Sequence, residues 1–335
     1  HINVVVELID DADAAFEIVS AALKKGKAVV SANKKMIAEH FTELLELQEK
    51  YNVPFLYEAA CCASIPIIRN LEEYYDNDLL ESIEGIVNGS TNYILTKTFA
   101  ENLSYNDALK QAQDRGFAES NPVLDTGGFD AKYKLLILLA HAFGYVAKPE
   151  DLFNIGIDGI GELELKYARE KGLKIKLVAQ AFKGADGSLS AFVIPKFVST
   201  EDRLYTVDDV FNGVLTKTCF ADTQFFVGKG AGAHPTASAV LSDISALSYN
   251  YRYEYKKIRQ QEELVLTDDL ELKVLLRHKK SDYDTFKKEF SSIEEAYTNS
   301  ESGYITGTLS LSNLKRLQLS NKGDRSFVLL SILSR

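Results

Sequence analysis

Residues 118–134 read AESNPVLDTGGFDAKYK, a loop marked by proline and glycine that runs directly into an apolar helix. The loop carries the acids Glu119 and Asp125, and Asp130 and Lys134 stand four residues apart on the predicted helix. This spacing places the last two side chains on one helix face, one turn from each other. Three carboxylates and a lysine are thus expected where a buried helix begins, which suits binding a zwitterionic substrate and giving it a proton. The plainer interpretation is a solvated loop followed by an ordinary ion pair, which contributes little to stability.

The composition is that of a globular protein with no attraction to anionic partners. A chain of 335 residues can bury a sizeable core and is expected to hold two or three domains. Its net charge of −10 argues against nucleic acid or an anionic membrane as the main partner. No apolar run approaches the roughly 20 residues that span a bilayer, and we expect no signal peptide. The three cysteines and the scattered histidines show neither a disulfide framework nor zinc-ligand spacing, so a reducing cytoplasm is the predicted location.

The first 58 residues predict half of a doubly wound α/β sheet, in which strands alternate with helices. Lys34 follows the second strand, and functional residues in such sheets lie at the carboxyl ends of strands. A solvated lysine beside Lys35 is the equal alternative. We find no GxGxxG turn and therefore expect the pyrophosphate-binding unit to precede His1 in a longer chain. As written, the chain is expected to bind a dinucleotide poorly or not at all, and to be inactive by itself. The expected strands are residues 4–9, 27–31 and 54–58. The first expected helix has its N-cap among residues 10–13 and runs to about residue 25, and the second covers about 36–51.

Three later loops have residues suited to a ligand. The loop from Glu58 to Ile68 is built of small residues, which permit close backbone approach, although tight packing alone explains them as well. Gly89 and Ser90 begin a helix whose free N–H groups and hydroxyls can hold a carboxylate, and capping uses the same groups. The glycine-rich loop 228–236 leads into a helix and can cradle a phosphate, or can be only a tight connection.

The rest of the chain predicts two further domains. A helix over 157–172 and alternating strands after it indicate an open, mostly antiparallel sheet. The charged segment 251–263 reads as a linker or an exposed helix, and the strand and helix signals beyond it have the βαββαβ order of a small ferredoxin-like, ACT-like module. That module suits regulation or assembly, and the sequence leaves both open. The expected domains are a remainder of a Rossmann domain (1–58, to which helix 233–247 returns), a substrate and dimerisation domain (59–232) and the C-terminal module (251–335).

Five motifs, in this order, make the chain resemble homoserine dehydrogenase over roughly residues 4–250. They are Ser31 to Lys35, Tyr57 to Ala59 with Ile65 to Ile68, Gly85 to Leu95, Ala118 to Lys134, and Gly228 to Thr236 with its helix. The resemblance implies the reversible, NADP- or NAD-dependent reduction of L-aspartate 4-semialdehyde to L-homoserine, in threonine and methionine biosynthesis. It also implies a homodimer formed through the middle-domain sheet.

The resemblance assigns roles to the acids and lysines. Lys134 falls on the family's proton donor, and Asp130 on the carboxylate one turn before it. Glu119 falls on the acid that binds the substrate's amino group, and Asp125 on a neighbouring acid of the pocket. Lys34 matches the lysine near nicotinamide and substrate, and Gly89 and Ser90 complete the candidate substrate-binding residues.

The resemblance also implies a cofactor loop and a cation. Gly230 and Gly232 match the later glycine loop that touches the cofactor. Backbone carbonyls of one loop match the ligands of a monovalent cation, sodium, and these belong to Glu58, Cys61, Ala63 and Ile65. Cys62 and Ser64 stand where we expect glycines in that loop, which puts the ion site in doubt.

Two other functions remain open at this level. A truncated, non-catalytic paralogue can serve as a regulatory or assembly subunit through its C-terminal module. Another amino-acid dehydrogenase that acts on a related semialdehyde would share the cofactor but needs a different pocket. The retained acids and Lys134 favour an enzyme, because a scaffold has no chemical need for them.

Overall fold

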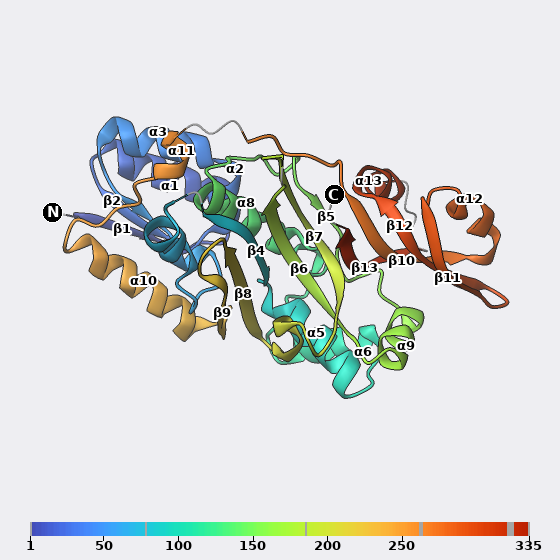
Figure 1. Ribbon diagram of the computed structural model, residues 1–335. Coiled ribbons are helices and arrows are strands. Elements are labelled where there is room, and N and C mark those ends of the chain that lie inside the picture. The colour runs from blue at the N-terminus through green and yellow to red at the C-terminus, as the bar shows by residue number, and fades with distance from the viewer. Residues whose placement is uncertain (1, 78, 185, 261–263, 320–324, 334–335) are drawn as a thin grey trace. The chain divides into compact units, whose positions relative to one another are not determined.

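The structure is a computed structural model that describes residues 2–77, 79–184, 186–260, 264–319 and 325–333 (Figure 1). The chain divides into two compact units. The first unit comprises residues 1–89, 130–152 and 210–264, and the second comprises residues 90–129, 153–209 and 265–335. No helix among the described residues is long and apolar enough to cross a membrane.

The first unit contains the predicted Rossmann-like half. Three parallel strands lie in the order β1-β2-β3, and Asp11 caps the first helix by accepting from the Ala14 N–H at 2.8 Å. The expected helix over 36–51 is wrong, because it is two helices that part at His40, whose ring stacks on Phe16 at 3.8 Å. The elements are β1 (Val4–Glu7), α1 (Ala12–Lys24), β2 (Ala28–Ser31), α2 (Lys34–Glu39), α3 (Phe41–Tyr51) and β3 (Phe55–Leu56).

The same unit holds an antiparallel sheet, β4-β8-β9, together with the helix α8 that the opening stretch predicts. The predicted helix over 233–247 is confirmed as α10, which packs against β2 and the short η1 turn. The elements are η1 (Glu58–Ala60), α4 (Ile67–Arg69), η2 (Asn70–Tyr74), β4 (Leu80–Ile86), α8 (Phe129–Phe143), β8 (Phe211–Thr218), β9 (Asp222–Lys229) and α10 (Ala233–Leu247). Only the first residue of α8 belongs to the other unit.

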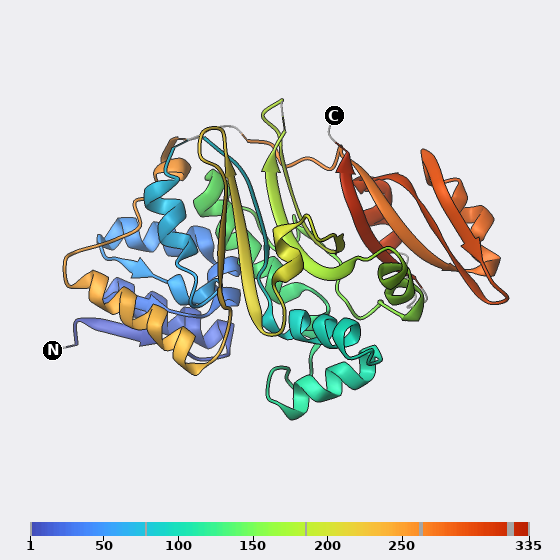
Figure 2. The same cartoon turned by 60° about the horizontal axis from the view of Figure 1, so that its bottom comes forward.

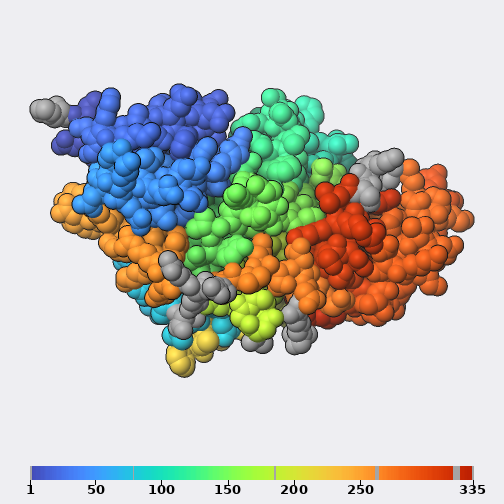
Figure 3. Space-filling view, turned by 90° about the horizontal axis from the view of Figure 1, so that it is seen from above, coloured from blue at the N-terminus to red at the C-terminus, as the bar shows by residue number. Residues whose placement is uncertain are grey.

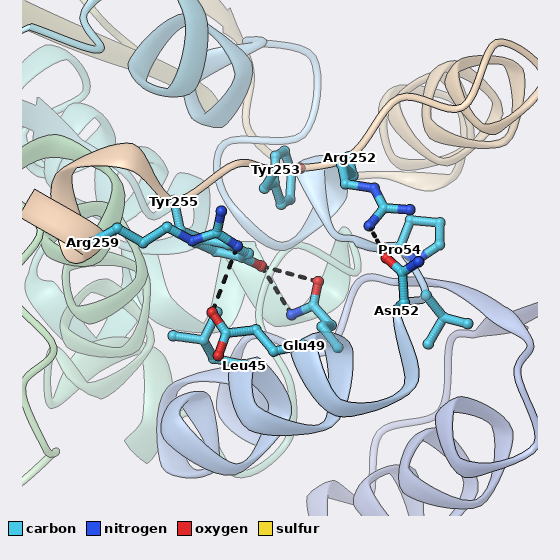
Figure 4. Close-up of a pocket in the computed structure, with 10 residues that line it drawn as sticks. Leu45, Glu49, Asn52, Pro54, Arg252, Tyr253, Tyr255 and Arg259 are labelled. Carbon is cyan, nitrogen blue, oxygen red and sulfur yellow. Dashed lines mark hydrogen bonds and ion pairs between the residues drawn. The ribbon is translucent and has the colours of Figure 1, made fainter.

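The described part of the charged segment 251–263 is not an exposed linker. The alternative, an exposed helix, is confirmed only for α11 (Lys256–Gln260), in which no residue is buried. Tyr253 and Tyr255 before it are buried. The Tyr255 hydroxyl accepts from Gln48 Nε2 at 3.0 Å, and a cavity of about 310 Å³ lies between this segment and α3 (Figure 4). The two tyrosines anchor the segment in the core of the unit. The sequence does not predict this, because charged residues surround them.

The second unit is built on the strand β7, which pairs antiparallel with β6 along its whole length and parallel with β5. The expected helix over 157–172 is wrong in its first part, because α9 begins only at Glu162. The Ile157 N–H donates instead to the carbonyl of Thr126 at 2.7 Å. The elements are α5 (Gly89–Ala100), α6 (Tyr105–Asp114), α7 (Val123–Thr126), β5 (Phe153–Asn154), α9 (Glu162–Glu170), β6 (Lys174–Lys183), β7 (Leu189–Val198) and η3 (Arg203–Thr206).

The C-terminal part of this unit has the predicted βαββαβ order. Its strands lie in the order β11-β12-β10-β13 and are antiparallel, which is the ferredoxin-like arrangement (Figure 2). In the space-filling view its residues, orange to red, form one continuous body (Figure 3). A cluster of buried apolar residues joins it to Phe192 and Ile194 of β7. The elements are β10 (Glu271–Lys279), η4 (Lys280–Asp282), α12 (Tyr283–Lys287), β11 (Ser292–Thr298), β12 (Ser302–Ser310), α13 (Leu311–Leu319) and β13 (Ser326–Leu333).

Candidate active site

A buried lysine–aspartate pair occupies the first turns of α8. Lys134 Nζ lies 2.7 Å from Asp130 Oδ2 and 2.7 Å from the Val87 carbonyl oxygen, and the Lys134 side chain is 9% exposed. A lysine ammonium has three donors, and these two contacts use two of them. One donor can therefore be offered to a ligand oxygen.

Asp130 stands between two lysines. Lys34 Nζ lies 3.0 Å from Asp130 Oδ1, and Asn88 Nδ2 donates to Oδ2 at 2.8 Å. Burial by itself would raise the pKa of Asp130, but the ammonium groups of Lys134 and Lys34 and the hydrogen bond from Asn88 outweigh it and hold the pKa well below its usual range. The carboxylate is therefore an anion at any physiological pH and fixes the direction of both lysines.

Lys34, predicted to lie at the end of a strand, is the second cation that pairs with Asp130. Asn33 caps α2 by accepting from the Met36 N–H at 2.9 Å, which sets the start of the helix on which Lys34 is the first residue. The Lys34 side chain remains 42% exposed. It can reach a ligand as well as Asp130.

The small-residue loop after β3 packs against α8. The Cys61 thiol donates to the Lys134 carbonyl oxygen at 3.8 Å. Glu58 turns its carboxylate to the N–H groups of Ile68 and Arg69, both at 2.9 Å, and burial raises its pKa to about 8. The loop is therefore fixed by hydrogen bonds at its start and touches the backbone of Lys134.

The candidate cation ligands lie in this loop. The carbonyls of Glu58 and Ile65 accept the N–H groups of Cys61 and Ile67. Each of these two carbonyls can therefore give only its second lone pair to an ion. Cys62 and Ala63 have φ values of 55° and 37°, the left-handed region in which a glycine would be unstrained.

The glycine loop 228–232 adjoins the loop after β3. Ser64 Oγ donates to the Lys229 carbonyl oxygen at 2.9 Å. Gly230 is closely packed, because a Cβ at this position would lie 2.0 Å from Asn212 Nδ2. Gly232 has φ 116° and precedes α10, so both positions require glycine. Because these two positions have no side chains and lie directly before a helix, a phosphate-bearing cofactor can approach the backbone closely.

The other candidate substrate residues lie in the second unit or at its edge. Glu119 is exposed, and its carbonyl accepts from Gln113 Nε2 at 2.9 Å. Asp125 lies in the one-turn helix α7, and Ser90 Oγ donates to the Phe117 carbonyl oxygen at 2.5 Å. Gly89, at the start of α5, packs against the Val210 carbonyl. Because these acids belong to the second unit, their meeting with Lys134 stays a prediction.

Sequence reasoning assigned no role to Asn88 or to the Val87 carbonyl, although both hold the lysine–aspartate pair. The available signal was their position at the end of a predicted strand, next to the candidate Gly89. Hydrogen-bond partners of that kind depend on how the strand meets α8, which spacing along one element does not reveal.

Known proteins resemble most of the chain, in sequence and in fold. A family model described as homoserine dehydrogenase matches residues 66–245, and one described as the NAD binding domain of homoserine dehydrogenase matches residues 1–58. Homoserine dehydrogenases of Helicobacter pylori and Lactococcus lactis are 40% and 37% identical over 244 residues, 73% of this chain. That stretch covers 57% of either relative's length.

Solved structures agree. A homoserine dehydrogenase from Thiobacillus denitrificans matches with a TM-score of 0.86 at 27% identity, over 98% of this chain and 82% of that one. A hyperthermophilic archaeal homoserine dehydrogenase in complex with NADPH matches with a TM-score of 0.65 at 30% identity, over 75% of this chain and 73% of that one. From its matched family models and its fold, the chain belongs to the homoserine dehydrogenase family.

Proposed function

We propose that the protein catalyses the reversible, nicotinamide-dependent reduction of L-aspartate 4-semialdehyde to L-homoserine, a step in threonine and methionine biosynthesis. The observation that carries the proposal is the buried Lys134 ammonium, held by Asp130 and the Val87 carbonyl with one donor to spare. Such a group suits a reaction in which an oxygen gains negative charge and then a proton.

The mechanism assigns the proton to Lys134. When bound, the nicotinamide cofactor supplies the hydride that reaches the aldehyde carbon. Lys134 Nζ stabilises the charge that develops on the carbonyl oxygen and gives its proton to that oxygen. Asp130 does not react, because its low pKa keeps it ionised, and it orients Lys134 and Lys34.

The substrate-binding roles follow the resemblance. Glu119 binds the amino group and Asp125 is a second acid of the substrate pocket. Lys34 contacts substrate and nicotinamide, and the start of α5 at Gly89 and Ser90 offers N–H groups to the carboxylate. Each of these roles is supported by residue type and position.

The cofactor is NADP or NAD, with Gly230, Gly232 and Lys34 among its contacts. The match to an NAD binding domain and the NADPH complex of the archaeal relative support a dinucleotide. A sodium ion on the carbonyls of the loop from Glu58 to Ile65 stays a prediction, and no step depends on it.

The proposed organisation is a cytoplasmic homodimer of three-domain chains. Residues 1–58 with α10 form the dinucleotide-binding part, 59–232 the substrate and dimerisation part, and 251–335 the C-terminal module. The antiparallel sheet β4-β8-β9 ends on β9, an edge strand that is half-exposed or exposed along its length and supports pairing with a second copy.

The test is turnover by the purified protein, expressed from its complete reading frame. NADPH should be consumed only when L-aspartate 4-semialdehyde is present, and homoserine should appear in equal amount. A chain that binds NADPH but shows no turnover contradicts the proposal. If that silent chain changes the activity of a purified homoserine dehydrogenase on mixing, the regulatory-subunit function is favoured instead.

A further inference from the structure

The segment between β5 and α9 holds the loop that carries Asp125. The two residues that follow Asp125, Thr126 and Gly127, accept hydrogen bonds from this segment. The Thr126 carbonyl accepts from the Ile157 N–H, and the Gly127 carbonyl accepts from Asn154 Nδ2, both at 2.7 Å. The loop is therefore fixed from outside, immediately after its acid.

The fit between these two backbones leaves no spare room. A Cβ at Gly156 would lie 2.0 Å from the Thr126 carbonyl oxygen and 2.5 Å from the Gly127 Cα. Real Cβ atoms do not approach backbone this closely. A displacement of the segment must therefore move Thr126 and Gly127, and Asp125 with them.

The segment is also hydrogen-bonded to two strands of the same unit, β7 and β10. Asn154 pairs with Val193 of β7, and the Ile155 N–H donates to the Val193 carbonyl at 2.8 Å. At the other end, Arg277 Nη2 on β10 donates to the Gly159 carbonyl at 2.6 Å. Glu164, which is fully buried, accepts from Arg277 Nε at 2.6 Å and sets the direction of the guanidinium.

We propose that Asn154 and Arg277 are positioning residues for substrate binding, which act on Asp125 through the segment 154–159. The inference rests on the proposed function, in which Asp125 belongs to the substrate pocket. In this proposal Arg277 connects the C-terminal module to that pocket through the segment 154–159. The proposal requires no contact of either residue with substrate or cofactor.

The main test compares Michaelis constants in the protein expressed from its complete reading frame. Asn154→Asp keeps the shape of the side chain but removes the N–H donor to the Gly127 carbonyl, and Arg277→Ala frees the Gly159 carbonyl. Each should raise KM for L-aspartate 4-semialdehyde by about 2- to 10-fold, the range for one net hydrogen bond, and leave KM for NADPH unchanged. The double variant should show less than the product of the two single effects, because both act through one segment.

Matched variants separate this role from plain stability. Lys273→Ala removes a cation four residues earlier on β10, where it pairs with Glu294 at 2.5 Å, and should leave both constants unchanged. Arg277→Lys keeps a donor near Gly159 and should recover part of the substrate KM. If Asn154→Asp lowers the melting temperature but not substrate affinity, the role is merely structural and the inference is overturned.

Hydrogen exchange keeps the inference testable without catalysis. A wild-type chain without turnover would contradict the proposed function, while the mechanical link is read from amide exchange in residues 123–128. Asn154→Asp and Arg277→Ala should accelerate exchange there, and Lys273→Ala should not. Unchanged exchange in both positioning variants would overturn the link itself.

Discussion

Lys134 and Asp130 form a buried ion pair 2.7 Å long on successive turns of α8, and the same carboxylate also faces Lys34. A single anion thus balances two cations at the start of α8. Removing one partner of a buried pair is costly because the remaining charges lose their counter-ion. We therefore expect the stability of the fold and the proposed role of Lys134 both to depend on this one carboxylate.

The Asp130→Asn variant should lose on the order of 3 kcal/mol of unfolding free energy at neutral pH. Because the folded-state pKa of Asp130 lies below its unfolded value, its stabilisation is present above the usual aspartate pKa and disappears as the pH falls below it. Urea unfolding between neutral and acid pH measures this. The difference in unfolding free energy between wild type and variant should become smaller as the pH is lowered. A difference that does not change with pH would contradict the ion-pair account.

Glu58 predicts a pH dependence of opposite sign. Its folded-state pKa is raised to about 8 by burial, above the unfolded value, so the folded chain binds more protons between the two values. Stability should therefore fall as the pH rises from that of a free glutamate towards 8. Glu58→Gln should flatten this part of the profile in thermal unfolding experiments. An unchanged slope would show that Glu58 does not titrate in this range.

Gly230→Ala should weaken NADPH binding. The added methyl would collide with the amide of Asn212, which is fully buried and has little room to move, so the glycine loop must shift. Titration of the chain with NADPH measures the loss of affinity. The double variant Gly230→Ala, Asn212→Ala restores the space and should recover binding. If Gly230→Ala binds NADPH as tightly as the wild type does, the glycine loop does not contribute to the cofactor site.

Residue spacing predicted the features that depend on one helix or on the order of helices and strands. The i,i+4 pair of Asp130 and Lys134 followed from helix geometry, and the βαββαβ order of the C-terminal module followed from strand and helix signals. Tertiary contacts decided the rest. The helix is interrupted at His40, whose ring stacks on Phe16, and Ile157 donates to Thr126 instead of joining α9.

The site was predictable in its charged residues and not in its partners. The place of Lys34 at a strand end suggested a role, but its contact with Asp130 depends on how the parallel sheet meets α8. Asn88 and the Val87 carbonyl carry no sequence signature, because any residue offers a carbonyl and asparagine is common in turns. The aromatic anchors Tyr253 and Tyr255 were hidden among charged neighbours.

The most direct test of the central claim is the turnover of Lys134→Ala with L-aspartate 4-semialdehyde and NADPH. Lys132→Ala is the control, because it removes a lysine from the same helix on a different face. The account predicts a loss of at least about 100-fold for Lys134→Ala, as for a missing general acid, and near wild-type turnover for the control. Near wild-type turnover of Lys134→Ala would contradict it.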